Sequence, residues 1–245
     1  MCNLYSLTTN IEAIREIVRE FDVAHDIGNF APQTSIYPDF LAPIIRNRDG
    51  LRELTKVRWG MPSPNFVQVQ AATKRAKAIE KKEGRALSKE EFKQLLADEP
   101  DRGVTNVRNL DSAHWKKWFD PKFRCVVPFT SFSEFNKDAG GDIWFAFDVD
   151  RPVAFFAGLW APQWTGKRSL KGERITSDLF AFLTTDPNKE VKAIHPKAMP
   201  VILRTAEEVE IWMTAPWAEA QKLVKPLPNG ALEIVARGAK KDPED

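Results

Sequence analysis

Cysteine is scarce in this chain, which has Cys2 and Cys125 and no others. Two thiols do not make the disulfide framework of a small secreted domain or a cysteine-based zinc site. No apolar run approaches the roughly 20 residues of a membrane span, and the N-terminus lacks the charged-then-apolar layout of a signal peptide. We therefore expect a cytoplasmic protein with no membrane association and no metal or organic cofactor.

An excess of charge of one sign is also lacking, because 36 basic residues stand against 34 acidic ones. Any nucleic-acid partner would therefore need a local basic patch. Tyrosine is rare too, with 2 residues beside 8 Trp and 16 Phe. Most of these aromatic side chains should lie in the core, and a few could act as stacking platforms for unpaired bases.

The sequence of the first half of the chain predicts one β-hairpin, with helices before and after it. Thr8, Thr9 or Asn10 can cap a helix that runs to about Asp22. Residues 44–45 and 51–57 form a predicted hairpin around a Gly-containing turn. Residues 71–98 form a charged helical insertion, in which Ser88 to Glu91 fits a capping box. Its mixed charges favour a solvated insertion over a DNA-binding arm.

From residue 123 onward the sequence favours strands. Short runs of β-branched and aromatic residues fall at 125–129, 143–148, 153–160, 179–184 and 199–203. Helices follow at 205 and 216, and a last strand at 231–235. The fold class we predict is α+β: a single domain over residues 1–235, built on a mainly antiparallel, barrel-like sheet with peripheral helices. Residues 236–245 are expected to be a frayed tail.

Cys2 is the most informative single residue, because removal of Met1 would leave its α-amine free beside its own thiol. An α-amine has a pKa of about 7.7–8.0, so much of it is neutral near pH 7. A neutral amine attacks an aldehyde to give an imine, and the neighbouring thiol can close on the same carbon as a thiazolidine. Residue 2 is thus a candidate aldehyde trap.

Other candidates are weak when taken singly. Asn106 can be a simple turn former, Glu134 a surface carboxylate among aromatics, and His195 a hydrogen-bonded structural residue. If Glu134 is buried, however, its pKa rises and it can hold a proton at neutral pH. Trp59 leads a loop rich in Gly and Pro. These residues alone indicate a possible cysteine-dependent site.

Five short motifs occur in the order of one family. They are Met1-Cys2; residues 59–62 (Trp-Gly-Met-Pro); residues 106–108 (Asn-Val-Arg); residues 124–128 with Ser-Glu-Phe at 133–135; and Ile-His at 194–195 with residues 199–203. The chain resembles the SRAP family, the SOS-response-associated peptidases or abasic-site processing proteins. The resemblance spans roughly residues 2–225.

The resemblance implies a covalent link to abasic sites in single-stranded DNA, which shields the lesion, and nucleoid association while the protein is bound to DNA. By motif, Cys2 would be the nucleophile, Asn106 would orient the adduct, and Glu134 would be the acid/base that opens the sugar ring. His195 would assist proton transfer, and Arg108 would hold a phosphate.

Three further DNA contacts come from the same comparison. Trp59 would act as an aromatic wedge, Thr184 would line the pocket, and Lys197 would replace an arginine of the family. Departures from the family pattern affect these flanking contacts more than the Cys2 chemistry. Residues 3–4 are Asn-Leu where Gly-Arg is common, Leu110 replaces a Glu, and Phe135 stands where Trp is frequent. The segment from 195 to 200 is one residue longer.

Two other functions stay open from the sequence. One is a cysteine peptidase, self-processing or acting on peptides, in which Cys2, His195 and Asn106 form a Cys-His-Asn set. The other is a non-covalent single-strand binder, whose affinity would not depend on the thiol. Protein partners are not indicated by any motif.

Overall fold

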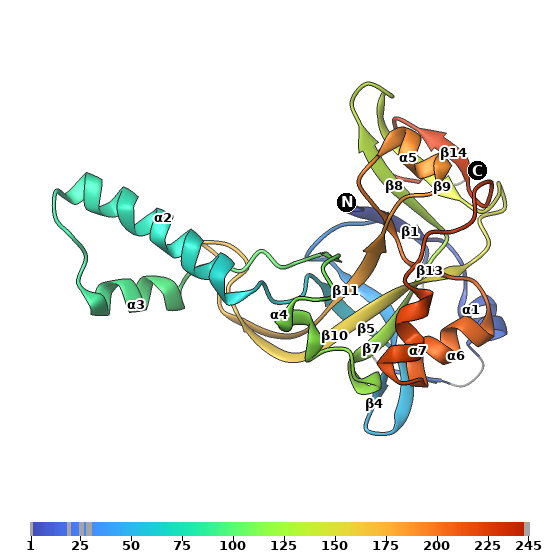
Figure 1. Ribbon diagram of the computed structural model, residues 1–245, viewed down its shortest axis with the longest axis horizontal. Coiled ribbons are helices and arrows are strands. Elements are labelled where there is room, and N and C mark those ends of the chain that lie inside the picture. Colours follow the sequence, from blue (N-terminus) through green and yellow to red (C-terminus); the bar gives the residue numbers. More distant parts are fainter. Residues whose placement is uncertain (1, 19–20, 25–26, 28–30, 243–245) are drawn as a thin grey trace.

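The computed structural model describes residues 2–18, 21–24, 27 and 31–242. A β-rich body carries short helices on its surface, and a pair of helices projects from one side (Figure 1). The strands are β1 Leu4–Leu7, β2 Asp22–Val23, β3 Gln33–Ile36, β4 Leu41–Arg48, β5 Leu51–Trp59, β6 Asn106–Val107, β7 Arg124–Phe129, β8 Ser131–Asn136, β9 Gly141–Ala146, β10 Ala154–Gly166, β11 Ile175–Thr185, β12 Met199–Pro200, β13 Ile202–Leu203 and β14 Glu233–Arg237.

The described helices are α1 Ile11–Ile17, α2 Asn65–Glu83, α3 Lys89–Ala97, α4 Ala113–Lys116, α5 Lys189–Ile194, α6 Ala206–Thr214 and α7 Trp217–Ala220, with short 3₁₀ turns at η2 Pro121–Phe123 and η3 Gln221–Leu223. Several begin where the sequence predicts. The Asn10 side chain caps α1, and Ser88 with Glu91 and Thr205 with Glu208 form complete capping boxes. Helix α1 ends at Ile17, earlier than expected, and residues 19–20 lie outside the described residues.

Five strands close into a barrel. β11, β10, β7, β4 and β5 are hydrogen-bonded neighbours in that order, and β5 pairs in parallel with β11 to complete the ring. The second sheet has the order β14-β9-β8-β1-β3. Strands β7 and β8 are separated by Thr130 alone, so the barrel and the second sheet belong to one domain. The predicted α+β single domain with a barrel-like sheet is confirmed.

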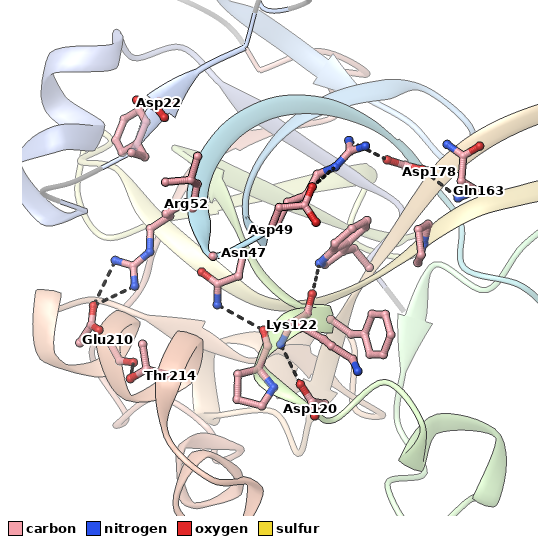
Figure 2. A pocket seen from close by; sticks show the side chains of 18 residues that line it. Asp22, Asn47, Asp49, Arg52, Asp120, Lys122, Gln163, Asp178, Glu210 and Thr214 are labelled. Carbon is pink, nitrogen blue, oxygen red and sulfur yellow. Dashed lines mark hydrogen bonds and ion pairs between the residues drawn. The ribbon is translucent and has the colours of Figure 1, made fainter.

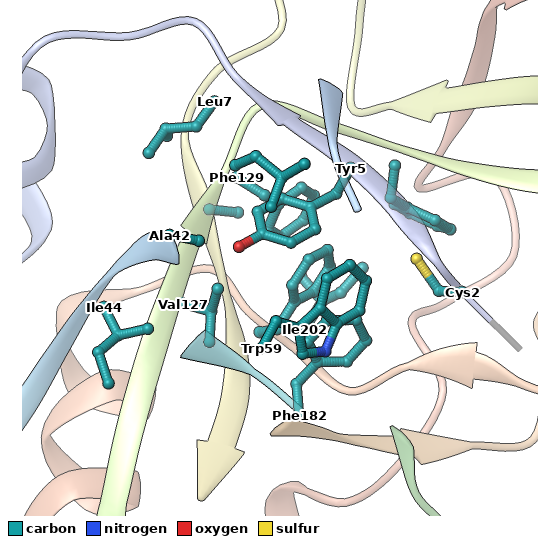
Figure 3. Close-up of a cluster of buried hydrophobic side chains, with 14 of the residues drawn as sticks. Cys2, Tyr5, Leu7, Ala42, Ile44, Trp59, Val127, Phe129, Phe182 and Ile202 are labelled. Carbon is teal, nitrogen blue, oxygen red and sulfur yellow. The ribbon is translucent and has the colours of Figure 1, made fainter. Parts of the chain in front are cut away.

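Alternation along the barrel strands divides the core in two. One set of side chains fills the inside, where Tyr5 from β1 contacts Trp59, Phe156 and Phe182 edge-on (Figure 3). The other set faces outward under the peripheral helices, including Val209, Trp212 and Met213 of α6.

Helix α6 is held on the barrel by polar contacts as well as packing. The Trp212 indole donates to the carbonyl of Cys125 at 2.9 Å. Arg124 on β7 is fully buried, and its guanidinium donates to the carbonyls of Phe119, Trp212 and Ala215. Burial lowers the pKa of Arg124 to about 10, and the carbonyl partners satisfy the hydrogen-bonding demand of the buried charge.

Helices α2 and α3 form an arm, defined here as residues 62–103, which projects from the barrel (Figure 1). The sequence predicts an insertion at 71–98, shorter than the observed helices. Met61 and Val104 pair as an antiparallel bridge at its base. Arg168 donates to the carbonyls of Gly60 and Asp101, so one guanidinium holds the two chain crossings together.

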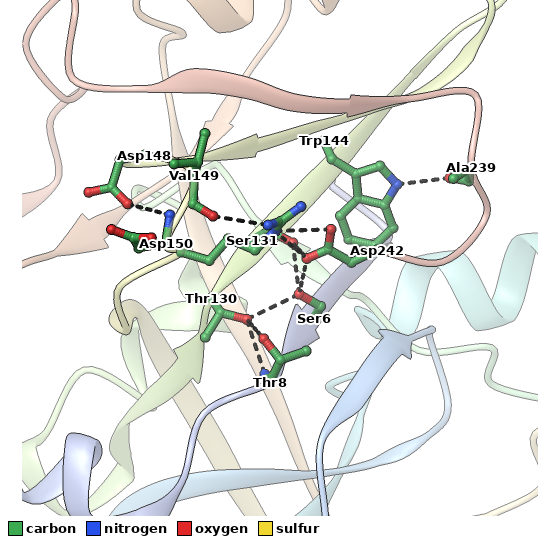
Figure 4. Close-up of polar contacts among 11 residues, drawn as sticks. Ser6, Thr8, Thr130, Ser131, Trp144, Asp148, Val149, Asp150, Ala239 and Asp242 are labelled. Carbon is green, nitrogen blue, oxygen red and sulfur yellow. Dashed lines mark hydrogen bonds and ion pairs between the residues drawn. The ribbon is translucent and has the colours of Figure 1, made fainter. Parts of the chain in front are cut away.

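The structure differs from the sequence predictions at two places. Glu134 lies within β8, a strand that the sequence did not predict. The tail was expected to be frayed, but β14 extends to Arg237 and Asp242 is buried. Its carboxylate accepts hydrogen bonds from Ser6 at 2.9 Å and Ser131 at 2.5 Å and pairs with Arg151 (Figure 4). Residues 243–245 of the predicted tail lie outside the described residues.

Candidate active site around Cys2

Cys2 precedes β1 and lies in the barrel core with no exposed surface. Its thiol donates weakly to the carbonyl of Leu4, with a sulfur–oxygen distance of 3.5 Å. Burial, and then the negative charge of Glu134, raise the pKa of the Cys2 thiol well above its ordinary value. The thiol is therefore protonated at neutral pH, and a nearby base must accept its proton when the sulfur attacks.

Asn106 contacts Cys2 directly. Its side-chain amide donates to the carbonyl of Cys2 at 2.8 Å and also to the hydroxyl of Thr105 at 2.8 Å. Strand β6 is anchored beside β11, with Asn106 opposite Phe182. The Asn106 amide oxygen is buried and has no hydrogen-bond partner among the described residues. A buried acceptor without a partner costs stability, so this oxygen is available for a ligand.

Glu134, whose charge reaches the Cys2 thiol, lies beside His195. The Glu134 carboxylate is 2% exposed, and burial raises its pKa to about 7. His195 Nδ1 lies 3.9 Å from Glu134 Oε2. Burial lowers the pKa of His195, and the positive charge of Lys197 acts in the same direction. Near pH 7 the site thus combines a carboxyl that can give or take a proton with a mostly neutral imidazole.

Asn136 positions His195, and the sequence analysis missed it. Its side-chain amide donates to the carbonyl of Ile194 at 2.7 Å, which ties the end of β8 to the end of α5. His195 itself is the C-cap of α5, and its backbone N–H donates to Val191. The spacing of Glu134 and Asn136 on one strand face could have suggested this role, had β8 been predicted.

The surface beside the site carries Arg108 and Lys197. The Arg108 guanidinium donates to the exposed Asp186 carboxylate at 2.5 Å and is 43% exposed. An exposed pair of this kind contributes little to stability, so Arg108 can exchange Asp186 for a phosphate. Lys197 is exposed in the turn between α5 and β12.

Two predicted DNA contacts are placed differently. Trp59 has no exposed surface, stacks near Phe180 and donates from its indole to Thr105 at 3.0 Å; the prediction of an aromatic wedge at this residue is wrong, because the ring fills the barrel. Thr184 is 2% exposed, and its hydroxyl donates to Val107 at 3.5 Å. It supports the strand that carries Asn106 and does not present a surface to DNA.

A large hollow of the molecule lies elsewhere. It measures about 1190 Å³ and is lined by the β4–β5 hairpin, η2 and α6, with Asn47, Lys122 and Glu210 among its residues (Figure 2). None of the residues around Cys2 lines it. Across the described part of the chain, no cluster of three or more His, Cys, Asp or Glu residues could hold a metal ion, and no helix there is long and apolar enough to span a membrane.

The family model described as SOS response associated peptidase (SRAP) matches residues 97–237, which is more than half of the chain. The chain belongs to the SRAP family. The matched segment contains Asn106, Glu134 and His195 but begins after Cys2 and after most of the arm. SRAP membership supports a function associated with the SOS response to DNA damage and suggests an interaction with DNA.

Solved structures share the SRAP fold seen here. A protein from Bacteroides thetaiotaomicron is 23% identical with a TM-score of 0.61, over 95% of this chain and 90% of the other. A protein from Bordetella bronchiseptica is 20% identical with a TM-score of 0.58, over 95% and 97%. A phage-related protein from the same organism is 19% identical with a TM-score of 0.59, over 95% and 92%. A search of the curated proteins found no match.

Proposed function

We propose that this SRAP protein captures abasic sites in single-stranded DNA through a thiazolidine formed at Cys2. The observation that carries the proposal is the grouping of Asn106 and Glu134 around Cys2: an amide 2.8 Å from its carbonyl and a carboxyl whose charge reaches its thiol. The proposal requires removal of Met1, which lies outside the described residues.

The chemistry begins with the sugar. An abasic deoxyribose is mostly a closed hemiacetal, and Glu134, protonated below its pKa of about 7, donates a proton as the ring opens. The Cys2 amine then adds to the aldehyde carbon, and water leaves as the imine forms. The thiol adds to the same carbon while its proton passes to the imine nitrogen, with Glu134 or His195 as the relay. One water is lost in total, and no oxidant is needed.

Asn106, Arg108 and Lys197 complete the proposed site. The amide of Asn106 fixes Cys2, and its unpartnered oxygen can accept a hydrogen bond from the sugar. Arg108 and Lys197 are both exposed and would bind phosphates next to the lesion.

The test is incubation with single-stranded DNA that carries one abasic site, followed by intact mass measurement. We expect a heat-stable adduct at the mass of protein without Met1 plus DNA minus one water. Cys2→Ser keeps a small residue and the amine, so it should give only an imine that borohydride traps. A stable adduct with Cys2→Ser, or none with the unaltered protein, would exclude the thiazolidine.

A cysteine peptidase is the second candidate, and the name of the family, SOS response associated peptidase, supports it. The geometry gives it less support, because burial and Glu134 raise the pKa of the Cys2 thiol, whereas a peptidase nucleophile needs a thiolate. Peptide turnover in the absence of DNA would favour this function. Binding and salt dependence that survive Cys2→Ser, with no adduct from the unaltered protein, would favour a non-covalent single-strand binder.

A further inference from the structure

The charges of the arm, mixed in the sequence, are separated in space. The acidic residues of α2 are Glu80 and Glu83. Glu80 accepts a hydrogen bond from the backbone of Leu87, and Glu83 pairs with Arg85. Both carboxylates are thus used within the arm, where they hold the turn between α2 and α3.

The basic residues of α2 lie mostly on another face. At about 100° per residue, Lys74, Lys77 and Lys81 fall within about 60° of one another and roughly opposite the buried Ala72 and Ala76. All three lysines are exposed. Among the described residues, none of the three forms an ion pair. This face of α2, called here the lysine face, therefore carries positive charge without an ion-pair partner among the described residues.

A groove runs beside the lysine face toward the site. It measures about 650 Å³, and it is lined by Val67, Ala71 and Ala78 on α2 and by residues 99–100 and 102–104 on the returning chain, with Lys74 and Arg102 contributing charge. Arg75, also in the lining, is already paired with Glu99 at 2.9 Å. The groove thus has an apolar floor with unpaired cations at its edge.

The arm is also fixed relative to Cys2. Val104, which pairs with Met61 at the base of the arm, is two residues before Asn106. Arg168 donates to both chain crossings at the base of the arm. Phe66, 63% exposed at the first turn of α2, lies between the body and the lysines.

We propose that the lysine face and its groove bind the single strand that leaves the site on one side of the lesion. The argument is charge complementarity: three unpaired cations in a row suit a phosphate backbone, and an apolar floor with an exposed Phe suits unstacked bases. The contact is independent of sequence. The inference rests on the proposed function, because it continues the DNA path from Cys2.

The test compares Lys74→Gln/Lys77→Gln/Lys81→Gln with the control Lys89→Gln/Lys93→Gln/Lys225→Gln, which removes equal charge from exposed positions on α3 and near the C-terminal strand. Binding to intact strands of about 4 and about 16 nucleotides is measured at several salt concentrations. For the longer strand, the slope of log affinity against log salt concentration should be smaller in magnitude by about 2 in the lysine-face variant, since each phosphate contact to a single strand contributes about 0.7. Its affinity should fall at least about tenfold, while the control and the shorter strand change little.

Abasic oligonucleotides with a single flank sharpen the result. The defect should appear with a flank on one side of the lesion only, because the arm leaves the body on one side (Figure 1). Equal defects with either flank, or equal behaviour of the two triple variants, would overturn the proposal. If the unaltered protein forms no adduct, the proposed function fails. Binding of the intact long strand then still tests whether the lysine face binds single-stranded DNA. Matching unfolding midpoints would exclude misfolding.

Discussion

At the scale of residues, Glu134 should set the pH dependence of capture. Its protonated form opens the sugar ring, so the rate falls as pH rises through its pKa of about 7. The Cys2 amine acts when neutral, so its contribution rises until about pH 8. We expect a bell-shaped profile of adduct formation with its maximum between about pH 7 and 8.

Glu134→Gln tests this assignment. The variant should be slower by about 10²- to 10⁴-fold, the range for loss of a general acid, and its residual rate should rise with pH and then level off. Initial rates of adduct formation on one abasic oligonucleotide, measured from about pH 5 to 9, give both profiles. If the variant keeps the bell-shaped pH profile, the fall in rate at high pH must be due to a group other than Glu134.

Tyr5 gives a prediction about stability. Its hydroxyl is buried in the barrel and has no hydrogen-bond partner among the described residues (Figure 3). Tyr5→Phe removes an unsatisfied polar atom and keeps the ring contacts to Trp59 and Phe182. The variant should be more stable by about 1 kcal/mol, measured by denaturant unfolding. A loss of stability would point to a partner for the hydroxyl, such as a buried water.

The sequence could identify individual reactive residues better than their surroundings. Asn106, Glu134 and His195 are brought near Cys2 as the family motifs imply. The prediction of an aromatic wedge at Trp59 was wrong. A Gly-Pro loop follows this residue, but Trp59 is the last residue of β5 and its ring is buried in the barrel. Asn136 was missed because β8, the strand on which it lies two residues after Glu134, was not predicted.

At the scale of elements, the sequence predicted where helices are capped, but it did not predict how the charges of the arm are arranged in space. Asn10, Ser88 and Thr205 cap helices where side-chain chemistry predicts. Strand β8 was overlooked because its aromatic residues, Phe132 and Phe135, are three positions apart, which breaks the period-2 alternation of a strand. The mixed charges of the arm separate only once α2 is helical, which a linear count cannot show.

Gly103 tests the joint of the arm. Its φ is +80°, and an added Cβ would lie 2.6 Å from Arg168 Nη1 and 2.9 Å from the backbone of Gly60. Gly103→Ala should therefore cost about 2–4 kcal/mol of unfolding free energy. Gly84, with φ +69° and nothing within 4 Å, is the matched control. Gly84→Ala should cost only about 1 kcal/mol for its left-handed backbone, and equal costs would mean that the close approach is relieved elsewhere.

At the scale of the whole molecule, the C-terminal segment stabilises the strand that follows Cys2. Asp242 accepts a hydrogen bond from Ser6 on β1 and pairs with Arg151, and its own backbone N–H donates to Thr34 beside β1. The sequence predicts a frayed tail here, because a short polar terminus carries no hydrophobic signal. Its anchoring depends on partners 91 to 236 residues away.

Asp242→Ala should lower the free energy of unfolding by about 3 kcal/mol, since it removes the buried carboxylate that Ser6, Ser131 and Arg151 all contact. The exposed neighbour Lys241 supplies the control, and Lys241→Ala should change stability by less than about 0.5 kcal/mol. Both are measured by denaturant unfolding at one pH. Equal small effects would show that the carboxylate is replaceable by solvent.

The Met61–Val104 bridge has a consequence for how such a molecule can vary. The chain leaves the barrel at Met61 and re-enters it at Val104, and these two residues pair as neighbours do in a hairpin. The barrel therefore joins the arm at the same two positions whatever the length of the arm. Insertions there are inexpensive in loop-closure entropy. The arm can therefore vary independently of the barrel. Shortening, lengthening or exchanging the arm should alter what the protein binds, while the residues around Cys2 keep their arrangement.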